Sequence, residues 1–200
     1  MTSGAAPATV GVLALQGDVR SHLRRLDALG ARSVPVKRPE QLAGLDGLVV
    51  PGGESTTISM LAQRWGLLAP IRELIGDGLP VFGSCAGMIM LADTVEGGRP
   101  DQLPFGGIDM VVRRNAFGRQ VDSFEADVEM AGLSGGPVRA IFIRAPWVES
   151  VGPRVEVLAA VDERIVAVRQ GALLATSFHP ELTGDLRVHE YFLRIIGQAA

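Results

Sequence analysis

The chain has 200 residues, enough for one domain with a substantial hydrophobic core. Hydrophobic residues make up 47% of it and charged residues 20%, a balance that excludes an intrinsically disordered chain. Lys and Arg total 19 against 22 Asp and Glu, so the net charge is −3. A mildly acidic chain lacks the positive field that nucleic-acid binding requires, and we expect no nucleic-acid partner.

We expect neither export nor membrane insertion. Cys85 is the only cysteine, so no disulfide can form within the chain, and a cytoplasmic location is expected. Residues 1–9 lack the basic and apolar regions of a signal peptide. The longest nearly apolar run, residues 81–92, has 12 residues, against the roughly 20 that span a bilayer.

Strand and helix signals alternate over the first half of the chain. Apolar runs predict strands over residues 9–15, 33–36, 47–50 and 80–83. Helical spacing predicts helices over 19–29, 56–65, 70–76 and 86–92, with Asp18 and Ser55 as N-caps of the first two. This order predicts an α/β fold, a single three-layer domain in which helices cover both faces of a mostly parallel sheet. Ligand sites in such sheets lie at the carboxyl ends of the strands.

The second half contains short strand signals separated by Gly, Pro or Asp, which predict hairpins that extend the sheet. These signals cover residues 108–113, 124–130, 138–143, 155–161, 165–169 and 173–177. Apolar residues at helical spacing predict a closing helix over 185–196. Residues 1–8 are expected to form a flexible tail ahead of a domain at 9–200. The segment 97–104 matches no predicted element or motif.

Residues 83–87, Gly-Ser-Cys-Ala-Gly, lie between a predicted strand and a predicted helix. This is the context of a nucleophile elbow, a tight turn with small flanking residues that exposes its central side chain. The N-terminus of the following helix favours the thiolate of Cys85 over its thiol. The backbone N–H of Ala86 lies beside the sulfur and can bind a developing oxyanion. A buried structural cysteine is the alternative, which the glycines and the strand–helix junction disfavour.

A cysteine nucleophile needs a base, and the base needs an acceptor that orients it. His179 and Glu181 follow the predicted strand 173–177 and supply both groups, while Pro180 stiffens the loop between them. We predict that His179 meets Cys85 in the folded chain, because the ends of strands in one sheet can converge. A solvated loop histidine is the alternative.

The other two histidines are weaker candidates. His22 lies among Arg20, Arg24 and Arg25, which is typical of a solvated helix face. His189 lies on the closing helix and is expected to be a half-buried packing residue. We therefore predict that Asn at either position leaves activity within a few-fold. Three histidines and one cysteine allow no zinc site of ordinary spacing, so no metal site is predicted.

Residues 51–55, Pro-Gly-Gly-Glu-Ser, follow the third predicted strand. Two glycines let the backbone approach a ligand closely, and the N–H of Gly53 can donate to an oxyanion. The alternative is a plain turn in which Ser55 caps the next helix. The lysine and the spacing of a phosphate-binding loop are absent from this segment. Arg114 and Arg144, near strand ends, can each bind a carboxylate, although spacing alone favours surface arginines.

The motifs PGGES at 51–55, GSCAG at 83–87 and HPE at 179–181 resemble, in this order, those of class I glutamine amidotransferases, which have a flavodoxin-like fold. Four further segments make the chain similar to the glutaminase subunits of pyridoxal 5′-phosphate synthase. They are LQGD at 15–18, KRPEQ at 37–41, RNAFGRQVDSFEA at 114–126 and FIRAP at 142–146. The similarity runs from about residue 10 to about residue 192.

This resemblance implies that the chain hydrolyses L-glutamine to L-glutamate and ammonia. Cys85 would be the nucleophile, His179 the base and acid, and Glu181 the residue that orients His179. Gly53 and Ala86 would form the oxyanion hole. The residues that would bind L-glutamine are Gly53, Glu54, Ser55, Arg114, Ile143 and Arg144.

The resemblance also implies a hetero-oligomeric complex with a (β/α)8-barrel synthase subunit, which combines the ammonia with a pentose phosphate and a triose phosphate in vitamin B6 biosynthesis. Ammonia released into open water would be protonated and diluted, so direct delivery is expected. Pyridoxal phosphate would be the product of the partner, and no cofactor is expected on this chain. The implied activity classes are hydrolase and, through the synthase, lyase.

Two alternatives stay open at this point. The chain could be the glutaminase of another amidotransferase complex, or another cysteine hydrolase of the same fold. It could also be a non-catalytic regulatory module, although the intact Cys85, His179 and Glu181 argue against that. Turnover of free glutamine with and without a barrel subunit would separate these interpretations.

Overall fold

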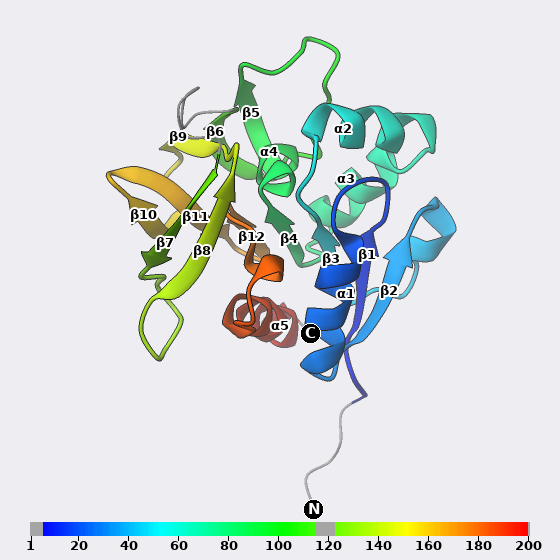
Figure 1. Ribbon diagram of the computed structural model, residues 1–200. Coiled ribbons are helices and arrows are strands. Elements are labelled where there is room, and N and C mark those ends of the chain that lie inside the picture. Colours follow the sequence, from blue (N-terminus) through cyan, green and yellow to red (C-terminus); the bar gives the residue numbers. More distant parts are fainter. Residues whose placement is uncertain (1–5, 115–122, 200) are drawn as a thin grey trace, which may run out of the picture.

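A sheet of mixed direction runs through the middle of the molecule (Figure 1). The computed structural model describes residues 6–114 and 123–199. Five neighbouring strands are parallel, in the order β2-β1-β3-β4-β12. They are β1 (Thr9–Leu13), β2 (Arg32–Val36), β3 (Gly47–Val50), β4 (Val81–Ser84) and β12 (Leu173–Thr176). The α/β fold with a mostly parallel central sheet, predicted from the alternation of strand and helix signals, is confirmed.

The sheet continues beyond β12 through β11, β9, β6 and β5, and β10 pairs with β11. These strands are β5 (Ala92–Glu96), β6 (Ile108–Arg113), β9 (Trp147–Val151), β10 (Glu156–Val161) and β11 (Arg164–Gln170). The predicted extension by hairpins is therefore confirmed for β10–β12. It is wrong for β7 (Ser123–Val128) and β8 (Val138–Ile143), which form a separate two-stranded sheet.

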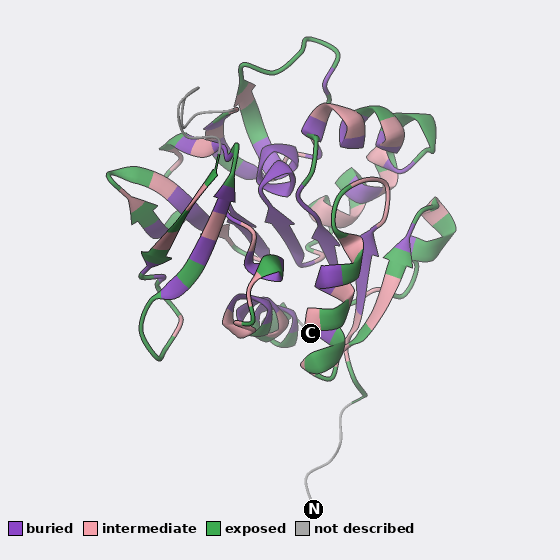
Figure 2. Cartoon of the chain, in the orientation of Figure 1, coloured by how far each residue is buried: buried purple, intermediate pink, exposed green. Residues whose placement is uncertain are grey.

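Helices cover both faces of the sheet (Figure 1). On one face α1 (Val19–Ala28) and α5 (Arg187–Ala199) lie beside the β7–β8 hairpin. On the other face lie α2 (Ser55–Arg64), α3 (Leu68–Gly76) and α4 (Ala86–Leu91). Two short 3-10 turns, η1 (Pro39–Leu42) and η2 (Pro180–Leu182), complete the described elements. The central strands and α4 are buried throughout (Figure 2), because both faces of a parallel sheet are covered.

Two strands were missed by the sequence analysis, β5 at the edge of the sheet and β9 between β11 and β6. The last apolar residue predicted for the helix 86–92, Ala92, begins β5 instead. Strand β9 contains two exposed polar residues among five, so its sequence lacks an apolar run. Residues 147–151 form a strand because they pair with β6, and this pairing cannot be read from the local sequence. The predicted cap Asp18 is confirmed by its acceptance of the Ser21 N–H at 3.1 Å.

Of the expected N-terminal tail, residues 1–5 lie outside the described part of the chain, and residues 6–8 belong to no helix or strand. The boundary of the domain at residue 9 stays a prediction. No described helix has the length and apolar character needed to cross a bilayer.

The order of the parallel strands brings three loops together. Strands β3, β4 and β12 are neighbours and point the same way, so their carboxyl ends lie side by side. The chain leaves β3 into Pro51–Gly53, leaves β4 into Cys85, and leaves β12 toward His179. Segments more than ninety residues apart in sequence therefore meet at one edge of the sheet.

The turn from β4 into α4 depends on two small residues. A Cβ on Gly83 would overlap the carbonyl oxygen of Gly87, and a Cβ on Gly87 would overlap the carbonyl oxygen of Val50 in β3. Glycine at both positions lets α4 fold back onto β4 and lie directly against β3. The predicted requirement for glycine around the cysteine is thus explained by close packing.

We predict that Gly87→Ala lowers the free energy of unfolding by about 1–3 kcal/mol, the range for overpacked interiors. The new methyl group would push α4 away from β3, which outweighs the better helix propensity of alanine. Urea denaturation measures the effect. Gly197→Ala is the matched control, because it lies in α5 with open space around it, and we expect it to be neutral or slightly stabilising. Equal stability gains in both variants would contradict the packing argument.

Candidate active site

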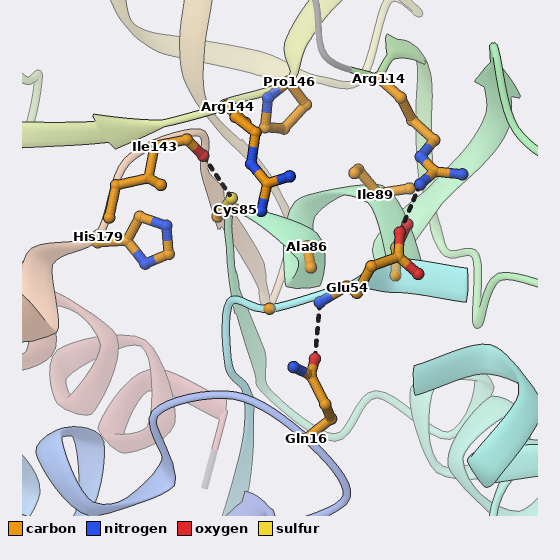
Figure 3. Close-up of a pocket in the computed structure, with 12 residues that line it drawn as sticks. Gln16, Glu54, Cys85, Ala86, Ile89, Arg114, Ile143, Arg144, Pro146 and His179 are labelled. Atoms are coloured by element: carbon orange, nitrogen blue, oxygen red, sulfur yellow. Dashed lines mark hydrogen bonds and ion pairs between the residues drawn. The ribbon is translucent and has the colours of Figure 1, made fainter. Parts of the chain in front are cut away.

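A pocket of about 300 Å³ opens at the carboxyl ends of β3, β4 and β12 (Figure 3). Its walls come from the loops after these strands and from segments after β1, β6 and β8. The residues that line it are Gln16, Gly53, Glu54, Ser55, Cys85, Ala86, Ile89, Arg114, Ile143, Arg144, Pro146 and His179. Its position at the strand ends is the one predicted from the fold class.

Cys85 lies at the junction of β4 and α4, where its backbone φ is +50°. This angle is unusual for a residue with a side chain and is a feature of strained turns at functional sites. The sulfur faces the pocket, 3.9 Å from the carbonyl oxygen of Ile143 (Figure 3). The residue is only 6% exposed, so the exposed side chain expected at this turn is instead buried at the pocket wall. The next residue, Ala86, is the first of α4, so its N–H has no acceptor within the helix.

His179 is held by a buried carboxylate. Its Nδ1 lies 2.7 Å from Oε1 of Glu181, whose side chain is only 1% exposed. Pro180 opens the η2 turn between them and gives the segment its fixed conformation. The absence of a side chain at Gly52 makes room for the ring, because a Cβ there would overlap Cε1 of His179.

The electrostatics of this group favour an imidazolium. Burial lowers the pKa of His179, but its contacts with Cys85 and Glu181 outweigh burial and raise that pKa to about 10. Burial likewise raises the pKa of Glu181, but His179 and the nearby His22 outweigh it, so the net shift is downward. A charged carboxylate beside the ring is the arrangement that stabilises an imidazolium.

The loop after β3 is fixed on both sides of the Gly52–Gly53 peptide. The N–H of Gly52 donates to Oγ of Ser84 at 3.1 Å, and the N–H of Glu54 donates to Oε1 of Gln16 at 2.6 Å. Gly53 has a φ of +144°, and a Cβ there would overlap the Gln16 amide. Glycine is therefore required both by conformation and by space.

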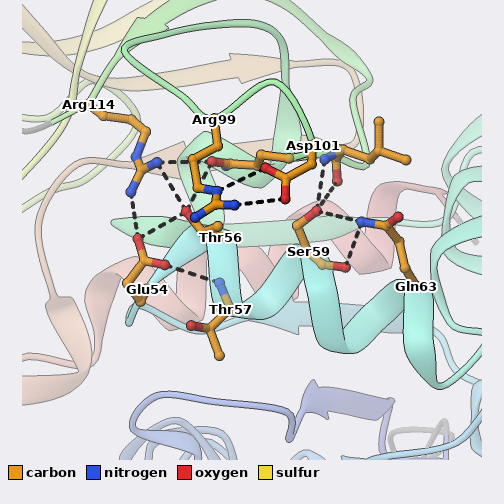
Figure 4. A network of polar contacts seen from close by, with 10 residues as sticks. Glu54, Thr56, Thr57, Ser59, Gln63, Arg99, Asp101 and Arg114 are labelled. Carbon is orange, nitrogen blue, oxygen red and sulfur yellow. Dashed lines mark hydrogen bonds and ion pairs between the residues drawn. The ribbon is translucent and has the colours of Figure 1, made fainter.

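An ion pair forms one wall of the pocket. Arg114 Nη2 lies 2.5 Å from Oε1 of Glu54, and Arg114 Nη1 donates to Thr56 and to Gln102 (Figure 4). Gln102 belongs to the segment 97–104, to which the sequence assigned no role. The contact of Gln102 gives the segment a role, because its side-chain oxygen accepts a hydrogen bond from the guanidinium of Arg114 and so fixes that group.

The same segment is anchored to α2 at a second point. The N–H of Leu103 donates to Oγ of Ser59 at 2.8 Å, and this hydroxyl lies 3.0 Å from the carbonyl oxygen of Leu103 (Figure 4). The segment is thus fixed to the helix that follows the Gly52–Gly53 loop.

The predicted cap of α2 is wrong. Glu54, rather than Ser55, occupies the N-cap position, and its carboxylate accepts the N–H of Thr57 at 3.1 Å. The Oγ of Ser55 is buried and has no hydrogen-bond partner within the described residues. Ser55 is nevertheless one of the residues that line the pocket.

The structure brings the predicted site residues together. Gly53, Glu54, Ser55, Cys85, Ala86, Arg114, Ile143, Arg144 and His179 line the pocket, and Glu181 lies behind His179. The analysis missed Gln16, Ile89 and Pro146, of which Gln16 and Pro146 lay in segments quoted only for their resemblance. Residues 115–122 of the motif 114–126 lie outside the described residues.

The interpretation of His22 as part of a solvated face is wrong. Its side chain is fully buried, with Nδ1 3.0 Å from Nε2 of His189. His189 is fully buried as well, rather than half-buried. Three arginines near His22 in sequence suggested exposure, but helical geometry turns its side chain to the opposite side, toward the sheet. Over residues 6–114 and 123–199, no cluster of three or more His, Cys, Asp or Glu could hold a metal ion.

Comparisons with known proteins agree with this geometry. The model of the SNO glutamine amidotransferase family matches residues 12–198. Pyridoxal 5′-phosphate synthase subunit PdxT of Frankia alni is 65% identical over 187 residues, covering 94% of each chain. The protein of the same name from Salinispora arenicola is 64% identical over 195 residues, covering 95% of this chain and 97% of its own. A crystal structure of a glutamine amidotransferase is 50% identical, with a TM-score of 0.89, and the match covers 94% of this chain and 98% of that one.

The expected lyase class is wrong for this chain. The matching family is one of glutamine amidotransferases, and the similar relatives are a single subunit of a synthase. A thiol, an imidazole and a carboxylate in one pocket are the groups that hydrolyse an amide through a covalent intermediate. Hydrolase is the class that fits.

We predict that stability falls between pH 6.5 and pH 4.5. Burial lowers the pKa of His22, and it lowers that of His189 to about 3. The unfolded chain therefore binds protons first as the pH falls, at up to about 1.4 kcal/mol per pH unit for each histidine. The carboxylates with lowered pKa affect the pH dependence of stability only at lower pH. The raised pKa of His179 affects it only above this pH range.

Urea unfolding at pH 7 and pH 5 measures this dependence. His189→Gln removes one titrating group, so its stability should vary less with pH than that of the wild type. Equal unfolding free energies of the wild type at both pH values would show that the histidines are not buried in the neutral form.

Proposed function

Because the chain belongs to the SNO glutamine amidotransferase family, we propose that it hydrolyses L-glutamine to L-glutamate and ammonia as a subunit of pyridoxal 5′-phosphate synthase. The observation that carries the proposal is the meeting of Cys85, His179 and Glu181 at one pocket. High identity over nearly the whole chain to relatives named as synthase subunits supports the assignment to that complex.

In the first half of the reaction, the sulfur of Cys85 attacks the side-chain amide carbon of glutamine. The carbonyl oxygen becomes an oxyanion, which the N–H groups of Ala86 and Gly53 would stabilise. His179 gives its proton to the amide nitrogen, the C–N bond breaks, and ammonia leaves. The product is a thioester between Cys85 and the glutamyl group.

In the second half, His179 takes a proton from water, and the resulting hydroxide attacks the thioester carbon. The C–S bond breaks, glutamate forms, and the thiolate–imidazolium pair is restored. Glu181 stays ionised throughout and stabilises the imidazolium, as its lowered pKa indicates.

The pocket wall suits an amino acid. Free glutamine carries an ammonium and a carboxylate on its α-carbon, and the ion pair of Glu54 with Arg114 offers the complementary charges. Arg144 and the unpartnered hydroxyl of Ser55 add donors beside them. Ile143 contributes its backbone carbonyl near the sulfur.

We further propose that the ammonia passes directly to a (β/α)8-barrel synthase subunit. Ammonia in open water takes up a proton and is no longer a nucleophile, so a protected path preserves its reactivity. A cytoplasmic location stays a prediction based on the single cysteine.

The alternatives differ in what they predict for the purified chain. A glutaminase of another complex would release ammonia from glutamine without stimulation by the barrel subunit. A regulatory module would release none under any condition. Glutamine hydrolysis with and without the barrel subunit is therefore the deciding experiment.

We predict that Cys85→Ala lowers the rate of glutamine hydrolysis by at least about 10³-fold, because the covalent route is lost. Alanine keeps the Cβ at this position, so the strain of the positive backbone φ is the same as in the wild type. Ammonia release by the complex measures the rate, and thermal unfolding establishes that the variant is folded. Near-normal turnover by a folded variant would remove Cys85 as the nucleophile.

We also predict that hydrolysis depends on the partner. The Gly52–Gly53 peptide lies between two fixed points, Ser84 on one side and Gln16 on the other. The Gly53 N–H serves an oxyanion in only one of the two orientations that a Gly–Gly peptide allows. We expect docking of the barrel subunit to select that orientation, which raises kcat by about 10²- to 10³-fold, the value of one oxyanion donor.

The test is kcat for glutamine with the chain alone and with saturating barrel subunit. Equal values would exclude gating by the loop and would leave the assignment of the three catalytic groups intact.

A further inference from the structure

Behind His179 and Glu181 lies a buried polar cluster that the reaction scheme does not use. It consists of His22 on α1, His189 on α5 and Ser84 at the end of β4, all shielded from solvent. His22 Nε2 lies 3.2 Å from Oγ of Ser84 and 3.5 Å from Oε2 of Glu181. This carboxylate oxygen is buried and has no hydrogen-bond partner within the described part of the chain, so the nearby ring nitrogen of His22 is available to it.

We propose that His22 is a positioning residue, which donates its Nε2–H toward Oε2 of Glu181 and so holds the carboxylate that orients His179. His189 fixes the tautomer by donating its Nε2–H to Nδ1 of His22. The inference rests on the proposed catalytic roles of Cys85, His179 and Glu181.

The choice of tautomer follows from the contacts of both rings. In the opposite tautomer, the Ser84 hydroxyl could donate to His22 Nε2, which is one favourable contact. The same arrangement would direct a ring lone pair at the Glu181 carboxylate. It would also place a hydrogen on His189 Nδ1, which is buried and has no partner among the described residues. Each tautomer leaves one buried donor without an acceptor among the described residues, the Ser84 O–H in the proposed one and the His189 Nδ1–H in the opposite one. The carboxylate decides between them, because an N–H directed at Glu181 is favourable and a lone pair directed at it is not.

His22 and His189 act here as neutral groups. Burial lowers the pKa of both rings, and Phe82 presses against them with ring-centre distances of 6.0 Å and 5.8 Å. The charged groups that affect the pKa of His22 are Glu181 and His179 from the η2 side and Asp18 from the start of its own helix. The pKa of His189 is also lowered by Arg25.

A neutral donor stabilises the carboxylate without competing, as a second cation would, for its negative charge. That charge stays available to the imidazolium of His179. The cluster therefore supports the charged state of the site and not only its shape.

The cluster also reaches the oxyanion loop. Ser84 Oγ, which faces His22, accepts the N–H of Gly52. One ring thus touches both the carboxylate behind the base and the hydroxyl that fixes the loop beside the nucleophile.

Two substitutions at one position test the proposal. In His22→Asn the amide reaches only the place of Nδ1, so the contact with His189 is kept and the donor toward Glu181 is lost. In His22→Gln the longer side chain carries an N–H to the place of Nε2. Both variants bury one amide, which makes their stabilities comparable.

Two measurements on the chain in complex with its barrel subunit decide the outcome. For His22→Asn we expect kcat for glutamine to fall about 10- to 100-fold, the range for loss of a partner that orients a metal-ligating side chain, with KM within about threefold. This replaces the few-fold effect expected from the sequence, which assumed that His22 is exposed. We also expect the pH midpoint of Cys85 alkylation by iodoacetamide to rise by about half a unit or more, because a loosened Glu181 supports the imidazolium and hence the thiolate less well. His22→Gln should recover most of both losses.

Leu26→Ala is the matched control, since Leu26 is buried one turn further along α1 and its apolar side chain takes no part in these polar contacts. It should lower the melting temperature and leave the alkylation midpoint unchanged. The proposal is overturned if folded His22→Asn behaves as the wild type, if Asn and Gln lose equally, or if Leu26→Ala shifts the midpoint as much. Absence of ammonia release by the wild type would instead refute the proposed function, while the alkylation profiles would still decide the role of His22.

Discussion

A carboxylate with almost no access to water must be compensated by its neighbours, and Glu181 is such a group. One of its oxygens contacts the ring of His179, and the other faces His22. These contacts keep the pKa of Glu181 below its ordinary value despite burial. The raised pKa of His179 depends on Cys85 and, after it, on that charge, so the protonation of the candidate base depends on a carboxylate one layer behind the pocket.

The fold supplies these contacts from distant parts of the chain. The parallel order of β3, β4 and β12 aligns three strand ends, which brings Cys85 and His179 to one edge of the sheet. Helices α1 and α5 pack on the face behind that edge, and each contributes one histidine. Glycines at 52, 83 and 87 remove the side chains that would otherwise keep the backbone segments apart. The polar cluster can therefore form only when the layers on that face and the strand ends are all in place.

Much of this could be predicted from local sequence. The strand–turn–helix pattern around Cys85 and the spacing of His179 and Glu181 depend on a few adjacent residues, and each was found. The alternation of apolar runs was enough for the parallel half of the sheet. Local sequence could not predict the pairing of distant segments, as in strand β9. It also could not predict the burial of His22, which has three arginines within three residues of it. Three-dimensional packing rather than composition decides both.

The polar cluster links two requirements of the proposed chemistry. A base needs a fixed orientation, and an oxyanion hole needs a fixed backbone. Here Ser84 directly precedes the candidate nucleophile, accepts the N–H of Gly52 and faces the ring of His22. A shift of the loop beside Gly53 would therefore act on Ser84, and through His22 on Glu181. The Glu54 side of the same loop is held by the long, partly accessible side chain of Gln16, whereas the Gly52 side is held by the buried Ser84. The Glu54 side is therefore the one that can move while the Gly52 side stays fixed.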